Sequence, residues 1–296
     1  MLCGPAGPAT VAFLLGLCAA LPADAGAVED FLSGTARDCP ECVLTGADLK
    51  HRALGQADLS GADLAGADFY AADLTGANLA GARLDGARFK RADASGADFT
   101  AATIREGNFH AAVLRGSVLA EAVLDGANFN RADLIRATLK GASLRQAMFY
   151  EAKLAGANLA GADLDGAMMG SSDLSSSDLA GAKLTHADLR NASLRGAGLA
   201  GAVLDASLLD RADLRDATAA GCSARETRLP WADARGMDLS GAVLDGANFY
   251  SADLRGANLA DASFSDGQLH RAHLVGAVLE GTRLTGTTMP DGTVHE

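Results

Sequence analysis

A large apolar residue returns at every fifth position between residues 42 and 291, without an insertion or deletion. The series starts at Leu44 and Leu49 and ends at Met289, and it is Leu or Phe in 43 of 50 pentapeptides. The residue two positions earlier is Ala in 37 of the 50, and two or three polar residues separate the apolar ones. A period of five fits neither a helix nor a strand, so the pattern predicts a solenoid of stacked coils.

The spacing of the central phenylalanines indicates the length of one coil. Five of them lie twenty residues apart, at Phe69, Phe89, Phe109, Phe129 and Phe149. If four pentapeptides make one coil, these rings stack in a single column, which is a favourable arrangement for aromatic rings. The 50 pentapeptides then make 12.5 coils. At the ~4.8 Å spacing of neighbouring strands, the rod is roughly 60 Å long.

The repeating unit, as in Ala77-Asn78-Leu79, resembles the pentapeptide repeat family over residues 42–291. This resemblance implies an all-β fold, a right-handed quadrilateral β-helix in which the central Leu or Phe and the small residue two before it point inward. It also implies one candidate function. Some members are similar to B-DNA in shape and acidity and bind DNA gyrase, so a DNA-mimicking binder of gyrase or of another nucleic-acid-binding protein is the alternative function here.

Residues 1–27 lack the five-residue pattern and are predicted to be a signal peptide. No charged residue occurs between Leu2 and Leu21, residues 11–21 are an apolar run, and small residues follow near Ala25. These features are typical of a cleaved secretory leader, which predicts a periplasmic or secreted protein. Because no Lys or Arg precedes the apolar run, an uncleaved anchor and a misassigned start remain alternatives.

Short segments are expected to close both ends of the rod. In the predicted N-terminal cap, residues 28–41, a helical turn places Val28, Phe31 and Leu32 along one apolar edge. Such a cap covers the open first coil, whose free edge otherwise invites aggregation. Pro290 and the Asp291-Gly292 turn signal stand where the C-terminal tail, residues 292–296, begins, and are expected to close the last coil.

Cys39 of the predicted cap and Cys42, the first residue of the repeat, form a Cys-x-x-Cys pair that could fasten the cap to the rod. In an exported protein such a pair favours a structural disulfide. A redox dithiol, a metal pair and free thiols stay open as other interpretations. Cys222 occupies an inward position of the repeat and is expected to be an inert buried thiol.

Two stretches depart from the repeat. Serines replace the inward alanine at Ser172 and Ser177 and are expected to alter the corner turn. Farther on, alanines replace three of four successive central residues while three usually small positions are enlarged: Ala219, Ala224 and Ala234, with Cys222, Thr227 and Met237. This predicts either a thin coil or a kink that presents a ligand near Pro230 and Trp231.

No catalytic, metal or cofactor site is predicted, so the sequence favours a non-enzymatic protein. The six histidines fall at outward or terminal positions without nearby ligands at metal-binding spacing. The aspartates mostly precede a central Leu and serve solubility and turn formation. No nucleophile elbow or phosphate-binding glycine loop occurs. The net charge of -12 argues against direct nucleic-acid binding.

Charge is unequal among the four sides of the predicted rod. From residue 42 to 291, the sides that begin with Leu44, Leu54 and Leu59 sum to -4, 0 and -6. The side of the phenylalanine column, which begins with Leu49 and is called the Phe-column face below, sums to +3. Its candidate binding residues are the exposed aromatic and basic ones: Tyr70, Lys90, Arg91, Arg131, Tyr150, Arg190, Arg211, Arg228, Trp231, Tyr250 and Arg271.

Tyr, Trp and Arg are enriched in binding hot spots, so this face is expected to contact a protein or an anionic surface polymer. The alternative is that the aromatic residues only follow a wider backbone above the phenylalanine column. No membrane contact beyond the leader is expected. The preferred function is therefore an exported structural or protein-interaction rod, whose partner the sequence does not identify.

Overall fold

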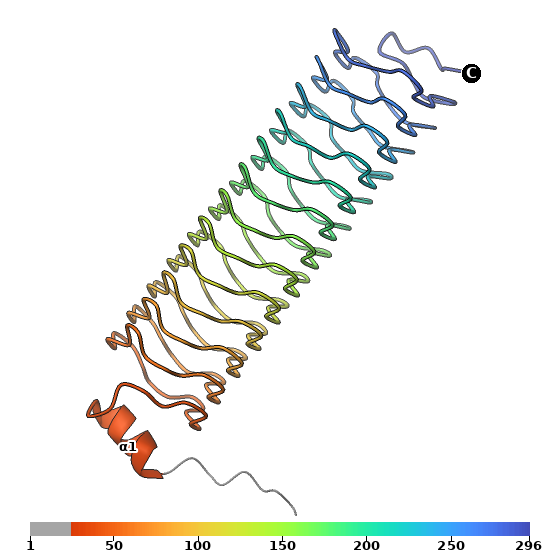
Figure 1. Ribbon diagram of the computed structural model, residues 1–296. Helices are drawn as coiled ribbons and strands as arrows, with labels where there is room; N and C mark the ends of the chain where they lie inside the picture. The colour runs from red at the N-terminus through yellow and green to blue at the C-terminus, as the bar shows by residue number, and fades with distance from the viewer. Residues whose placement is uncertain (1–24) are drawn as a thin grey trace, which may run out of the picture.

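Parallel β-bridges between residues twenty apart organise the chain into a rod of stacked coils (Figure 1). The computed structural model describes residues 25–296. The parallel series runs from Val43–Asp63 to Gln268–Thr288. Four pentapeptides therefore make one coil, which is the length that the phenylalanine spacing predicts. In residues 25–296 each coil side contributes one bridge residue, the residue before the central Leu or Phe, and no longer strand is assigned.

Backbone hydrogen bonds explain why a five-residue unit repeats so strictly. Asp63 N donates to Cys42 O of the preceding coil (2.8 Å), and Leu64 N donates to Arg83 O of the following coil (2.7 Å). The corner residue, Gly66, has a φ of +68° and also donates to the following coil. Every corner from residue 46 to 286 has such a positive φ. An added or deleted residue would break this register in both neighbouring coils.

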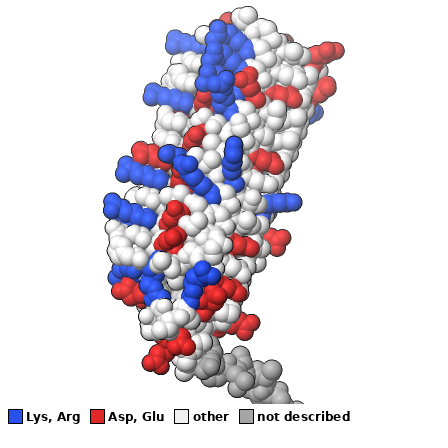
Figure 2. Space-filling view, turned by 60° about the vertical axis from the view of Figure 1, so that its left-hand side comes forward, with Lys and Arg blue, Asp and Glu red and all other residues white. Residues whose placement is uncertain are grey.

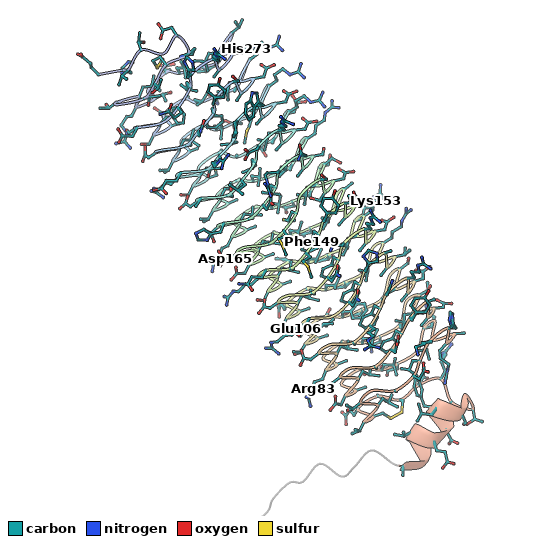
Figure 3. All side chains as sticks on the ribbon, turned by 180° about the vertical axis from the view of Figure 1, so that it is seen from behind. Arg83, Glu106, Phe149, Lys153, Asp165 and His273 are labelled. Carbon is teal, nitrogen blue, oxygen red and sulfur yellow. A yellow bond between two sulfur atoms is a disulfide. The ribbon has the colours of Figure 1, made fainter. Side chains whose placement is uncertain are left out.

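The core is the narrow interior of the rod. The five predicted phenylalanines lie in one stack, with centroid distances of 4.6–4.9 Å and interplanar angles of 2–6°. Phe109 has Phe89 and Phe129 as stacking neighbours, as predicted. Figure 3 shows Phe149 within the width of the rod, while Lys153 and Asp165 lie towards opposite edges.

The acidic or amide residue before the central Leu or Phe caps a backbone amide at the turn. The Asp98 carboxylate accepts a hydrogen bond from Thr100 N (2.8 Å), and Asn108 does the same for His110 N (3.0 Å). Where this position is apolar, the cap can come from the preceding coil: Asn130 Oδ1 accepts from Tyr150 N (2.8 Å). The repeated Asp and Asn are thus local turn residues first.

The expected effect of the inward serines was wrong. Ser172 N keeps the turn hydrogen bond to Met169 O (3.1 Å), and Ser177 N keeps the equivalent bond to Leu174 O (3.1 Å). Each hydroxyl also donates to the same carbonyl, at 2.7 Å. Because the buried hydroxyl finds an acceptor within its own turn, the corner is preserved.

Helix α1 (Ala25–Ser33) lies at the N-terminal end of the rod (Figure 1). Phe31 is fully buried, and the Arg52 guanidinium lies 5.4 Å from its ring centroid. Arg52 also donates to Phe31 O (2.7 Å) and Leu32 O (3.0 Å) at the C-terminal end of the helix, where a cation is favourable. Arg52 occupies an inward alanine position, and its contacts explain this exception.

The predicted signal peptide lies outside the described residues except for its last three, which already belong to α1. The helix thus begins at Ala25, ahead of the predicted cap boundary at residue 28. The leader and its cleavage site stay predictions.

The C-terminal tail folds back on the last coil. Val294 forms an antiparallel bridge with Thr288, and Met289 N donates to Thr293 O (2.7 Å). The central residues Leu274 and Leu284 of this coil are only partly buried. The tail therefore pairs with one side of the final coil.

The alanine-rich coil keeps its register and contains a small cavity. Bridges continue through it from Leu208 to Arg228 and from there to Asn248, so no kink interrupts the rod. A cavity of about 20 Å³ lies beside Ala224 and Cys222 and has an apolar lining. Burial raises the pKa of the Cys222 thiol to about 12, which agrees with the predicted inert thiol.

Candidate functional site

Charged side chains cover the outside of the rod, and most basic ones have an acidic neighbour. Figure 2 shows Lys and Arg interleaved with Asp and Glu along the side that it draws. Arg215, for example, contacts both Asp213 (2.6 Å) and Asp233 (3.6 Å) on the side that begins with Leu54. A basic side chain of the Phe-column face can bind an anionic partner most readily where no carboxylate of the rod already pairs with it.

Three of its candidate arginines are paired with carboxylates of the same face. Arg131 contacts Glu151 (2.8 Å) and Arg190 contacts Asp188 (2.5 Å). These guanidinium groups hold the pKa of the Glu151 and Asp188 carboxyls below their usual values. The third pair is Arg228 with Asp210, at 3.0 Å.

The remaining candidate arginines each contact an aromatic side chain and make no ion pair with any described residue. Near the N-terminal end, Arg91 Nη1 donates to the Tyr70 hydroxyl (3.4 Å), and His51 packs edge-on against the same ring at 5.5 Å. Lys90 likewise makes no ion pair within residues 25–296.

A second aromatic and basic cluster lies toward the C-terminal end. The Arg211 guanidinium lies 5.6 Å from the centroid of the Trp231 ring, a cation–π distance. Trp231 meets Tyr250 edge to face at 5.8 Å, and Arg271 Nη1 donates to the Tyr250 hydroxyl (3.1 Å). Trp231 is 53% exposed. The predicted residues therefore form two separate clusters, with Tyr150 between them along the rod.

Backbone strain adds nothing to the case for Trp231. Its φ is 57°, which would be unusual for a bulky residue in isolation. However, Trp231 occupies a corner, and corners throughout the rod have the same conformation. The strain is a property of the repeat and carries no functional information.

The same face also has a depression that was not predicted from the sequence, which we call the Gly170 notch. It has a volume of about 330 Å³ and is lined by Asn130, Met148, Tyr150, Met168, Gly170, Ser171, Asp188, Arg190 and Asn191. Two signals could have revealed it. Methionines stand at Met148 and Met168 where Asp or Asn is usual, and Gly170 follows the centre, where a side chain is usual.

Within residues 25–296, no group of three or more His, Cys, Asp or Glu side chains could hold a metal ion. Cys39 and Cys42 are joined by a disulfide, with their Cα atoms 5.4 Å apart. In the same part of the chain, no helix has both the length and the apolar character needed to cross a membrane.

The fold and this surface define a solenoid repeat protein, a β-helical rod with its side chains arranged in long columns. The pentapeptide repeat model matches eight copies between residues 42 and 266, so the chain belongs to the pentapeptide repeat family. Pentapeptide repeat proteins fold as right-handed β-helices, in agreement with the predicted fold class. No curated protein sequence matches this chain significantly.

Solved structures of pentapeptide repeat proteins are similar to parts of this chain. One is HetL, involved in heterocyst differentiation regulation in Nostoc sp. strain PCC 7120, with 33% identity over 75% of this chain and 92% of HetL, at a TM-score of 0.29. A trypsin-treated form of QnrB1, a plasmid-mediated fluoroquinolone resistance protein, shares 20% identity over 58% of this chain and 85% of its own, at a TM-score of 0.34. A protein from the Arabidopsis thaliana thylakoid lumen shares 30% identity over 33% of this chain and 64% of its own, at a TM-score of 0.22.

Proposed function

We propose that this chain is an exported, non-enzymatic interaction rod that contacts a partner of anionic character through its Phe-column face. The observation that carries the proposal is the set of arginines on this face that lack a carboxylate partner among the described residues. Each contacts an aromatic side chain instead: Arg91 and Arg271 donate to tyrosine hydroxyls, and Arg211 lies over the Trp231 ring. A guanidinium that lies over a ring, or that donates one N–H to a tyrosine hydroxyl, keeps further N–H donors for a carboxylate, sulfate or phosphate of the partner.

The surrounding charge supports an anionic partner on this side. The Phe-column face has a net charge of +3, while the two faces beside it sum to -4 and 0 and the opposite one to -6. The order of the pentapeptides along the coil fixes this arrangement, because the side that begins with Leu49 lies between those that begin with Leu44 and Leu54. An anionic partner is therefore repelled least by the Phe-column face.

The binding test replaces Tyr70, Tyr150 and Trp231 together with Ser. Partners are recovered from the exported fraction with the tagged wild-type protein and then measured one at a time. The triple variant should weaken association by at least about tenfold, since aromatic hot-spot residues contribute about 2 kcal/mol or more each. A matched variant on the opposite face should leave association unchanged. It replaces Asp98, Glu121 and Asp238 with Ser. If this variant lost association and the aromatic variant kept it, binding would belong to the acidic face that begins with Leu59.

Export is tested by N-terminal sequencing of the purified protein from each cell fraction. The proposal expects a chain that begins near Gly26 or Val28 outside the cytoplasm. An intact Met1 in the cytosolic fraction would contradict export.

The alternative function is a DNA-mimicking binder of gyrase or another nucleic-acid-binding protein. It is favoured by one observation, the charge of -6 on the face that begins with Leu59. Inhibition of DNA supercoiling by purified gyrase, lost in the acidic-face variant and kept in the Tyr70, Tyr150 and Trp231 variant, would support it over the interaction rod.

A further inference from the structure

The Gly170 notch results from one missing side chain in a column of the Phe-column face. Residues that follow the centre stack above one another every twenty positions, here Asn130, Tyr150, Gly170 and Arg190. A Cβ atom at Gly170 would meet only Tyr150 Cδ2 and Arg190 O, both at 3.7 Å. The space above Gly170 is therefore open, with a ring on one side and the next coil on the other.

The walls of the notch suit an aromatic group. Tyr150 and Met168 are 49% and 47% exposed, and Met148 lies one coil away from Met168 in the same column. Methionine sulfur atoms make favourable contacts with aromatic rings, and the flexible side chain adapts to the shape of its occupant. The tyrosine ring offers a further aromatic contact to such an occupant, beyond the apolar area that it buries.

The notch also offers two hydrogen-bond donors for a carboxylate. At most acidic turns, an Asp carboxylate before the centre accepts from the amide after it, as Asp173 does for Ser175 N (3.0 Å). At Gly170 both possible sources of this cap, Met168 and Tyr150, lack a carboxylate or amide oxygen, and the Gly170 amide has no acceptor among the described residues. Other turns leave this amide uncapped too, but here it borders the notch.

The second donor belongs to Arg190. Its Nε and Nη2 atoms bind Asp188, at 2.8 and 2.5 Å, which fixes the plane of the guanidinium. The remaining Nη1 has no acceptor among the described residues.

We propose that the Gly170 notch binds an aromatic side chain of a protein segment in which a carboxylate stands next to that side chain. The ring lies between Tyr150 and the two methionines, and the carboxylate takes the place of the missing aspartate at the Gly170 amide and reaches Arg190 Nη1. The proposal rests on the proposed function, because it identifies a docking point on the Phe-column face and the chemistry of its occupant.

A protein segment fits the notch better than a free small molecule does. Ligand pockets commonly have volumes of roughly 300–1,000 Å³ and enclose most of the ligand. The notch, at about 330 Å³, lies at the small end and opens along the surface of the rod. It can hold one side chain, while Tyr70 and Trp231 on the same face remain available for other parts of a long partner.

The test uses a short synthetic peptide with one phenylalanine between two glutamates, blocked at both ends. The protein is labelled with ¹³C at the methionine methyl groups, so that Met148 and Met168 report directly on the notch. The peptide should shift both signals in a saturable manner and leave the buried Met237 signal unchanged. A peptide with alanine in place of phenylalanine should bind at least about tenfold more weakly.

Met168→Asp is the decisive variant. This change places the usual acidic residue before the centre. The new carboxylate is expected to cap the Gly170 amide, so the coil should keep its stability. The notch loses one apolar wall and the free amide donor. The peptide should bind at least about tenfold more weakly to this variant. Val118→Asp, the same kind of change on the Leu59 side, should leave the affinity unchanged.

Three results would overturn the proposal: no saturable shift of Met148 and Met168, equal affinity in Met168→Asp, or phenylacetate that binds as tightly as the peptide. The last result would assign the notch to free aromatic acids. A further pair of results would separate the two proposals. If replacing Tyr70 and Trp231 abolished association with the natural partner while the peptide caused no shift at Met168, peptide binding in the notch would be refuted and the proposed function would still stand.

Discussion

Each corner of the rod couples a central residue to the small residue three positions later. At three of the four corners with a central Ala the later residue is enlarged, Ala94 with Ala97 being the exception, and after Ile104 and Phe264 it is reduced to glycine: Ala219 with Cys222, Ala224 with Thr227, Ala234 with Met237, Ile104 with Gly107 and Phe264 with Gly267. The two residues of such a pair share one corner, where a Cβ at Gly107 or Gly267 would lie within 3.0 Å of the side chain of Ile104 or Phe264, so close packing favours a smaller residue beside a bulkier one.

Gly107→Ala tests this coupling at a single atom. A Cβ there would lie 2.7 Å from Ile104 Cγ2, so the corner must shift, at a cost of about 1–3 kcal/mol. Gly198→Ala is the control, because its Cβ would meet no atom closer than 3.8 Å. Chemical unfolding measures both variants. Adding Ile104→Leu restores the common Leu and Ala pair and should recover the loss; if it does not, corner volume is not the cause.

At the scale of one coil, the alanine-rich segment leaves unfilled space in the core. Thr227 fills part of the space left by Ala224, and its hydroxyl donates to Leu204 O (2.7 Å), but a cavity remains. Empty space costs stability because the atoms that line it lose contacts. This coil should therefore open before its neighbours, as expected for a solenoid whose stability is a sum over adjacent coils.

Ala224→Leu combined with Thr227→Ala should stabilise the protein by about 0.5–2 kcal/mol. The leucine continues the column of Leu204 and Leu244, which line the cavity, and the alanine makes room for it. Ala94→Leu is the contrasting variant: Phe89 and Phe99 meet nearby with centroids 5.7 Å apart, so added bulk should destabilise that coil. Thermal unfolding followed by circular dichroism measures both. Equal stabilisation by the two would contradict a cavity specific to Ala224.

At the scale of the whole molecule, the stacking of coils places charged side chains of successive coils in columns along the rod. Asp213, Asp233 and Asp253 lie in one column, and arginines of the same side bridge from one coil to the next. Exposed pairs contribute little one by one. The arginine hydrogen bonds nevertheless lower the pKa of Asp213 and Asp253.

These pKa shifts predict loss of stability in acid. A carboxyl with a lowered folded-state pKa stabilises the fold above its unfolded pKa, near about 4, and loses this contribution as the pH falls through the folded value. The unfolding midpoint should therefore stay nearly constant between about pH 7 and 5 and fall below about pH 4.

Arg215→Gln removes the contacts to Asp213 and Asp233, so the unfolding midpoint of this variant should fall less between neutral and acidic pH than that of wild type. Its midpoint should lie below that of wild type at neutral pH and approach it in acid. Arg283→Gln is the control, since Arg283 makes no ion pair among the described residues. A difference between Arg215→Gln and wild type that does not change with pH would contradict the electrostatic origin.

The sequence alone determined the repeat, the twenty-residue coil and the phenylalanine stack, and it pointed to the Phe-column face. These features follow from local rules that repeat every five residues: an inward Leu or Phe, a small residue two before it, a turn-capping Asp and a corner of positive φ. The period and the position of Phe69 relative to Phe89 suffice to place both rings in one column.

Only the tertiary structure decided which side chains of neighbouring coils contact each other, and where the space between coils stays unfilled. It paired Arg190 with Asp188 but placed Arg211 on Trp231, and it used Arg52 to hold α1. It also formed the notch at Gly170. Each outcome depends on side-chain conformation and on residues about twenty positions away, because a rod with a uniform backbone differs from coil to coil only in how side chains fill the space between them.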